Sequence, residues 1–262
     1  MKIFKAITTA FSPALIIGCV LLFASCKKED DAMPAPDPNT VYPLKITIQN
    51  KVGVQPLALN TPYTNAHGEN YKITDFKYYI SNVSLVDEGG TETKLPDTYF
   101  LIDAKNAAST SFTLNTKGNK FKSIRFLVGV DSTRNVSGVQ TGALDPVNGM
   151  FWTWSTGYIM AKLDGTYSSG AISSLNFSYD IGGFQTGENV TRKVSLSLPS
   201  TLVLKTATAS ELVLTADANA WFKGVYDVKL ATDPFSLNPG PLAMKIADNY
   251  AKMFTVLEVI NR

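Results

Sequence analysis

Short segments in which apolar and polar residues alternate are the feature of this sequence that most limits its fold. Alternation with a period of two turns one face of an extended strand toward a core, and clusters of Gly, Pro, Asn and Asp interrupt it at regular spacing. Such segments lie at residues 44–49, 71–86, 98–102, 110–114, 121–130, 151–163, 174–181, 193–198, 211–215, 225–230 and 254–260. They predict an all-β chain with a single β-sandwich or barrel-like domain over residues 43–262.

One stretch near the C-terminus has helical periodicity instead. Apolar residues recur at helical spacing from Leu242 to Met253, and the turn Pro239-Gly240-Pro241 precedes them. Proline in the first turn favours a helix start, because its missing N–H is not needed there. We therefore expect one C-terminal helix, and only a short helical turn at Ala218 to Phe222.

The first 42 residues differ in composition from the rest of the chain. Two lysines precede an apolar run, 14–24, which is too short to span a bilayer as a mature helix. Small residues before Cys26 resemble a bacterial lipobox, which predicts a lipoprotein-type signal peptide, 1–25, and lipidation of Cys26. The alternative is a plain secretory signal with a free cysteine. Spaced prolines then predict a flexible tether, 26–42.

These features imply a location. A lipidated Cys26 would anchor the domain to a bacterial outer membrane, either on the periplasmic side or exposed at the surface. The lysines and acids that follow Cys26 are similar to surface-export signals of Bacteroidetes lipoproteins.

The net charge argues against nucleic acid as a partner. Removal of residues 1–25 takes away Lys2 and Lys5 and no acid, which leaves 22 basic and 22 acidic side chains. A balanced chain creates no long-range positive field. A small ligand, a metal or another protein is the expected partner.

Common catalytic groups are scarce in this sequence. His67 is the one histidine, and its polar neighbours are typical of a solvated turn. No phosphate-binding glycine loop, dinucleotide fingerprint, CxxC or HExxH pattern is present. We therefore expect that the protein is not an enzyme.

The long polar loop 129–150 carries oxygen-bearing side chains, namely Asp131, Asn135, Asp145 and Asn148. Carboxylate and amide oxygens suit hard ions such as calcium. The same residue types also cap turns by bonding to nearby backbone. The sequence is compatible with both a calcium site and a set of turn caps in this loop.

The loop and the strand after it resemble the MbnP-like family, named for a methanobactin-associated copper-binding protein. The resemblance rests on Gly129-Val130-Asp131, Asn135, Gly138, Gln140 to Pro146, Asn148 to Trp154 and Gly157-Tyr158. Further matches are Val52-Gly53, Tyr78 to Asn82, Ile181 to Phe184, Trp221-Phe222 and Ile246 to Tyr250. Together they extend over most of the predicted domain.

The resemblance implies a β-rich extracytoplasmic protein associated with copper. In such proteins histidines bind copper together with a kynurenine, which a partner di-haem protein of the peroxidase type makes from tryptophan. By resemblance, Trp152 and Trp154 are the candidate kynurenine precursors. Packing in a core is the alternative role for both.

The sequence departs from the family at the implied ligand positions. Where copper-competent relatives have histidine, this chain has Asn50, Asp180 and Leu237, and Glu258 stands where relatives can carry another. Asp180 can still ligate a metal, whereas an amide is a poor copper ligand and leucine is none. The sequence therefore predicts a lipoprotein of this copper-binding family with the histidine ligands lost. The alternative is a metal-free or calcium-stabilised surface interaction module.

Overall fold

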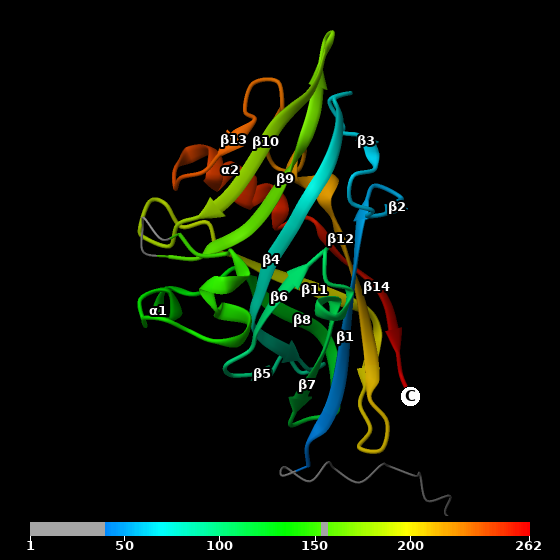
Figure 1. The fold of residues 1–262 in the computed structure, drawn as a ribbon. Helices are drawn as coiled ribbons and strands as arrows, with labels where there is room; N and C mark the ends of the chain where they lie inside the picture. Colours follow the sequence, from blue (N-terminus) through cyan, green and yellow to red (C-terminus); the bar gives the residue numbers. More distant parts are fainter. Residues whose placement is uncertain (1–39, 153–156) are drawn as a thin grey trace, which may run out of the picture. The chain divides into compact units, whose positions relative to one another are not determined.

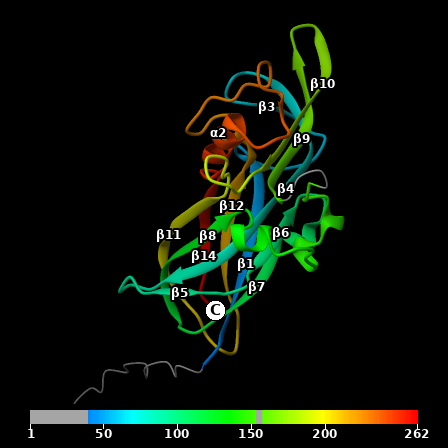
Figure 2. The same ribbon diagram turned by 90° about the vertical axis from the view of Figure 1, so that its left-hand side faces the viewer.

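A computed structural model describes residues 40–152 and 157–262, which all belong to the compact unit Pro36–Arg262. Their strands form two sheets (Figures 1 and 2). In these residues no helix has the length and apolar character needed to cross a membrane.

The first sheet is built around the N-terminal strand β1. β1 runs parallel to β12, which pairs with β14 in antiparallel register, and β7 and β2 pair with the other edge of β1. The strands are β1 (Tyr42–Val52), β2 (Gln55–Pro56), β7 (Ser111–Thr116), β12 (Ser210–Asp217) and β14 (Phe254–Ile260).

The second sheet is built around β4 (Asn70–Val86), a strand of 17 residues. Its length lets β9 pair with its first half and β8 with its second half, while β10 pairs with β9 and β11 with β8. The other strands are β3 (Pro62–Thr64), β5 (Glu92–Lys94), β6 (Tyr99–Asp103), β8 (Lys120–Val128), β9 (Ile159–Ser169), β10 (Ile172–Gly182), β11 (Arg192–Val203) and β13 (Phe235–Ser236).

The core lies between the two sheets. Phe254 of β14 contacts the rings of Tyr78 on β4 and Phe126 on β8, with centroid distances of 5.6 and 5.0 Å. All three side chains are buried. Contacts of this kind across the gap define a sandwich, and the predicted all-β sandwich class is confirmed.

The predicted C-terminal helix is present as α2 (Pro241–Tyr250) and lies beside the short 3-10 helix η4 (Ala218–Trp221). Trp221 is fully buried, and its ring contacts Phe76 of β4, Tyr179 of β10 and Tyr250 of α2. These contacts join the helix to the second sheet and place Phe76 and Tyr179 on the same face of that sheet.

Two predicted strands differ from the structure. Residues 225–230 are not a strand, because side chains rather than a neighbouring strand form hydrogen bonds with their backbone groups. Asn249 accepts from the Tyr226 N–H and donates to its carbonyl, and Glu69 accepts from the N–H groups of Leu230 and Ala231. In the segment 151–163, Phe151 forms an isolated bridge with Tyr158, and β9 begins only at Ile159.

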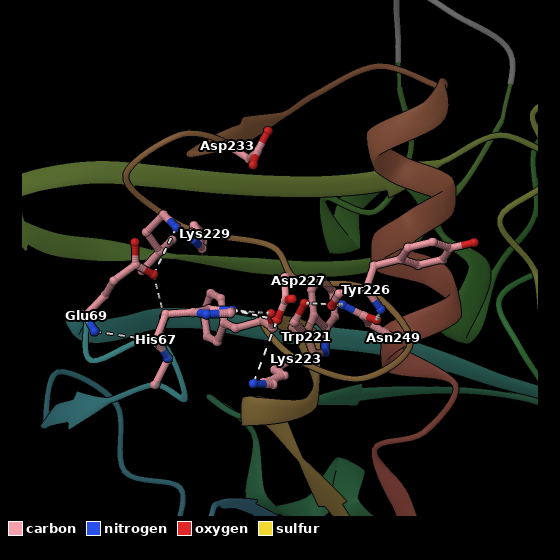
Figure 3. Close-up of polar contacts among 12 residues, drawn as sticks. His67, Glu69, Trp221, Lys223, Tyr226, Asp227, Lys229, Asp233 and Asn249 are labelled. Atoms are coloured by element: carbon pink, nitrogen blue, oxygen red, sulfur yellow. Dashed lines mark hydrogen bonds and ion pairs between the residues drawn. The ribbon is translucent and has the colours of Figure 1, made fainter.

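His67 belongs to the polar cluster that Glu69 and Asn249 form with residues 225–230, shown in Figure 3. Its turn was predicted to be solvated, yet its side chain is only 10% exposed. The imidazole Nε2 lies 3.0 Å from the carbonyl oxygen of Phe222 and 3.6 Å from Asp227. The prediction of a surface histidine was wrong because His67 packs against a segment that is distant in the sequence.

Candidate metal and ligand site

Asp180 lies on β10, opposite Lys162 of β9 in the antiparallel register. The Lys162 ammonium lies 2.6 Å from one Asp180 oxygen and 3.6 Å from Asp164. The side chains of Asp180 and Lys162 are each 17% exposed. Burial lowers the pKa of Lys162, but the hydrogen bond to Asp180 and the charge of Asp164 outweigh it, so the net shift is upward. Asp180 therefore already has a tightly held cation.

Asn50 lies on β1, in the other sheet. Its side-chain oxygen accepts a hydrogen bond of 2.7 Å from the hydroxyl of Tyr78, which is fully buried. Loss of this acceptor would leave a buried hydroxyl without a partner, which typically costs about 1–3 kcal/mol. The Asn50 side chain therefore has a structural role between the sheets.

Asn50 and Asp180 lie on opposite sides of the second sheet. Tyr78 and Tyr179 share the core-facing side, since Tyr78 packs with Phe76 and Trp221 contacts both Phe76 and Tyr179. Successive side chains along a strand point to opposite faces, so Asp180 faces outward while Tyr78 reaches inward to Asn50. No single ion can be bound by both residues.

The other two implied ligand positions do not complete a site. Leu237 follows Ser236, which pairs with Tyr179, so it lies close to Asp180 but brings only an apolar side chain. Glu258 lies on β14 of the first sheet, where it is exposed. The two remaining carboxylates are thus on different sheets, and this donor set does not fit a copper ion.

Trp152 lies against the end of β10. Its indole packs against Gly182, where an added Cβ would come within 2.5 Å of the ring. Gly182 is two residues along β10 from Asp180, so the structure brings Trp152 and Asp180 into one neighbourhood. Trp152 is only 6% exposed, which agrees with a packing role. Trp154 and Cys26 lie outside the described residues.

Asp131 caps the short helix α1 (Ser132–Asn135) by accepting from the backbone N–H of Arg134. Its other oxygen accepts from the hydroxyl of Tyr99 and from the amide of Asn82. Burial raises the pKa of Asp131, but these hydrogen bonds outweigh it and lower the pKa overall. The loop carboxylate is therefore ionised and already hydrogen-bonded.

The other loop side chains also bond to nearby backbone. Asn135 is buried, accepts from the N–H of Tyr158 and donates to the carbonyl of Val130. Asp145 caps the 3-10 helix η3 (Pro146–Asn148), and the Asn148 amide donates to two carbonyls of η2 (Gly142–Leu144). Across residues 40–152 and 157–262, no group of three or more His, Cys, Asp or Glu is placed to hold a metal.

Sequence reasoning missed Lys162, which decides the environment of Asp180. Lys162 alternates with buried neighbours on β9, so the pattern predicts that it faces outward, but not which residue it meets. That depends on the register of the β9–β10 hairpin, in which Lys162 lies opposite Asp180. The hairpin itself was a detectable signal, because Gly170 separates two alternating segments.

Residues 41–239 match the family profile described as MbnP, which is most of the chain. The chain belongs to the MbnP family. A solved structure titled "MbnP from Methylosinus trichosporium" is similar at 13% sequence identity and a TM-score of 0.49, over 83% of this chain and 98% of that chain. A comparison with curated proteins finds no match.

Replacement of Lys162 tests the ion pair in this MbnP family member. We expect Lys162→Met to lower the free energy of unfolding at neutral pH by about 1–3 kcal/mol, because two partly buried carboxylates lose their cation. Lys223→Met is the control, since this lysine is 57% exposed and its partner Asp227 is 62% exposed, so its loss should cost less than about 1 kcal/mol. Urea unfolding measures both.

The pH dependence of the same pair has a defined sign. The pKa of Lys162 is raised in the folded state, so its contribution is complete below the ordinary value of about 10.4 and is lost as the pH rises through the folded value. The difference between wild type and Lys162→Met should therefore shrink in strongly alkaline buffer. Equal stability of the two proteins at neutral pH would contradict a structural ion pair.

Replacement of Asp131 tests whether the loop carboxylate is a cap or a calcium ligand. We expect Asp131→Ala to cost about 1–2 kcal/mol, as for other helix caps. Because the pKa of Asp131 is lowered, this stabilisation is present above about 3.9 and is lost as the pH falls through the folded value. Denaturant unfolding with and without calcium measures it. A rise in stability on adding calcium that Asp131→Ala abolishes would favour the ion site.

Proposed function

We propose that this chain is a lipid-anchored, extracytoplasmic member of the MbnP family that acts as a binding module and does not carry copper. The family is associated with copper, so the proposal depends on how this chain fills the implied ligand positions. The supporting observation is the Lys162 ammonium, 2.6 Å from Asp180, which occupies the place where a metal would have to bind this carboxylate.

The remaining positions support the same proposal. A copper ion near Asp180 would find Leu237 beside it and a cationic lysine opposite. The amide of Asn50 is on the other side of the sheet and accepts from Tyr78. Displacement of these contacts would expose a buried hydroxyl and separate a partly buried ion pair, and both changes cost free energy.

We also propose where the protein is located and that its tryptophans are unmodified. Anchoring through a lipidated Cys26 would keep the domain at a bacterial outer membrane, on the periplasmic or surface side, as its N-terminal sequence predicts. Trp152 and Trp154 are proposed to stay unmodified, so no di-haem partner is required. We also propose that the domain has no enzymatic activity of its own.

Elemental analysis and intact mass of the full-length protein, purified in detergent from its native host, test this proposal. The expected result is far less than one copper per chain, loss of residues 1–25, added acyl mass on Cys26, and unmodified tryptophans. A stoichiometric copper complex would contradict it, and so would a gain of one oxygen with loss of one carbon at Trp152 or Trp154. A Cys26→Ser variant should lack the acyl mass and leave the copper content unchanged.

A further inference from the structure

A cleft of about 830 Å³ opens on the outward-facing side of the second sheet. Residues of β4, β5, β8 and β11 line it, together with the start of α1. Leu127 belongs to its floor, between Phe126 and Val128, whose side chains face the core. The Asp180–Lys162 pair is not part of this lining, so the cleft is separate from the implied metal position. Its volume lies in the range of ligand-binding pockets.

Positive side chains on three strands converge on this cleft. Lys94 comes from β5, Arg125 from β8 and Lys193 from β11. Both lysines are exposed, and neither forms an ion pair with any residue in 40–152 or 157–262. Arg125 is 47% exposed and lies 3.4 Å from Glu92. Two cations are therefore free to meet a ligand, and a third is only partly neutralised.

The acidic side chains that line the cleft already have hydrogen-bond or ion-pair partners. Glu92 accepts from the hydroxyl of Ser84 at 2.5 Å and pairs with Arg125. The pKa of Glu92 is lowered, chiefly by the hydrogen bond from Ser84 and also by the nearby Arg125 and Lys94. Asp131 accepts from Tyr99 and Asn82, as described above. The lysines therefore set the sign of charge that a ligand meets.

The rest of the lining indicates the class of ligand. Hydroxyl and amide groups of Ser132, Asn189, Thr191 and Ser195 surround an apolar floor. Among the described residues of the lining, Phe126 is the one aromatic and is only 3% exposed, so these residues offer no ring face to a neutral sugar. A peptide chain fits this pattern better, because its amides can pair with the hydroxyls and its carboxylates with the lysines.

We propose that this cleft binds an acidic segment of a partner protein. The inference rests on the proposed function as a binding module and names its site. Carboxylates of the segment pair with Lys94 and Lys193, and the apolar floor receives small side chains between them. Since the contacts are largely exposed charge pairs, binding is expected to weaken as salt is added.

Fluorescence anisotropy with the full-length protein in detergent tests the cleft. The probe is a labelled peptide in which Asp and Glu alternate with Ser and Val, and a matched peptide carries Asn and Gln in their place. We expect only the acidic peptide to bind. The double variant Lys94→Glu with Lys193→Glu should weaken that binding about tenfold or more, because two attractions become repulsions. Exposed Lys117 and Lys205 lie outside the lining, and the double variant Lys117→Glu with Lys205→Glu is the control.

Two outcomes would overturn the inference: no binding of the acidic peptide, whether or not a uronic acid oligosaccharide binds at these lysines, or equal weakening by the control variant. The assay does not depend on copper. Failure here leaves the proposed lack of copper standing, and a stoichiometric copper complex would leave the peptide result standing.

Discussion

The alternation of side chains along the second sheet is the constraint on which the rest of this structure depends. On the inner side, Tyr78 reaches across the core and fixes Asn50 of the opposite sheet. On the outer side, Lys162 holds Asp180. Because strand geometry separates these two contacts by the thickness of a sheet, the implied ligand positions Asn50 and Asp180 take part in two separate structural interactions.

The same strands explain why the outer face can still bind other molecules. The outward positions of β9 and β10 are closed by the Lys162 ion pair, and the indole of Trp152 covers Gly182. The outward positions of β5, β8 and β11, in contrast, leave an open cleft in which Lys94 and Lys193 form no ion pair with any residue that the structure describes. The sheet thus keeps an exposed face whose charges are available, while protein side chains surround the implied ligand position Asp180.

Much of the fold was predictable from the spacing of apolar residues and from the turn residues that separate the segments. β4, β10 and α2 follow their sequence patterns closely, since apolar residues recur on the buried face of each over many residues. The segment 225–230 has the same pattern but is irregular, because Glu69 and Asn249 satisfy its backbone. Strand register was not predictable from the sequence, even within the β9–β10 hairpin, so neither the partner of Asp180 nor the faces on which Asn50 and Asp180 lie could be derived. The cleft was missed for the same reason, as it is assembled from four strands.

Asp180 is paired with Lys162 and has no histidine beside it among the described residues, although its position would suit a copper ligand. Competition of the full-length protein with a Cu(I) chelator tests this explanation most directly, with wild type compared with the variant Asp180→His and Leu237→His. These positions are adjacent on β10 and at the end of β13, so the account predicts that the variant withdraws copper from the chelator and wild type does not. Adding Asn50→His should bring no further affinity, because that residue lies on the other side of the sheet. Tight binding of one copper by wild type would contradict the account.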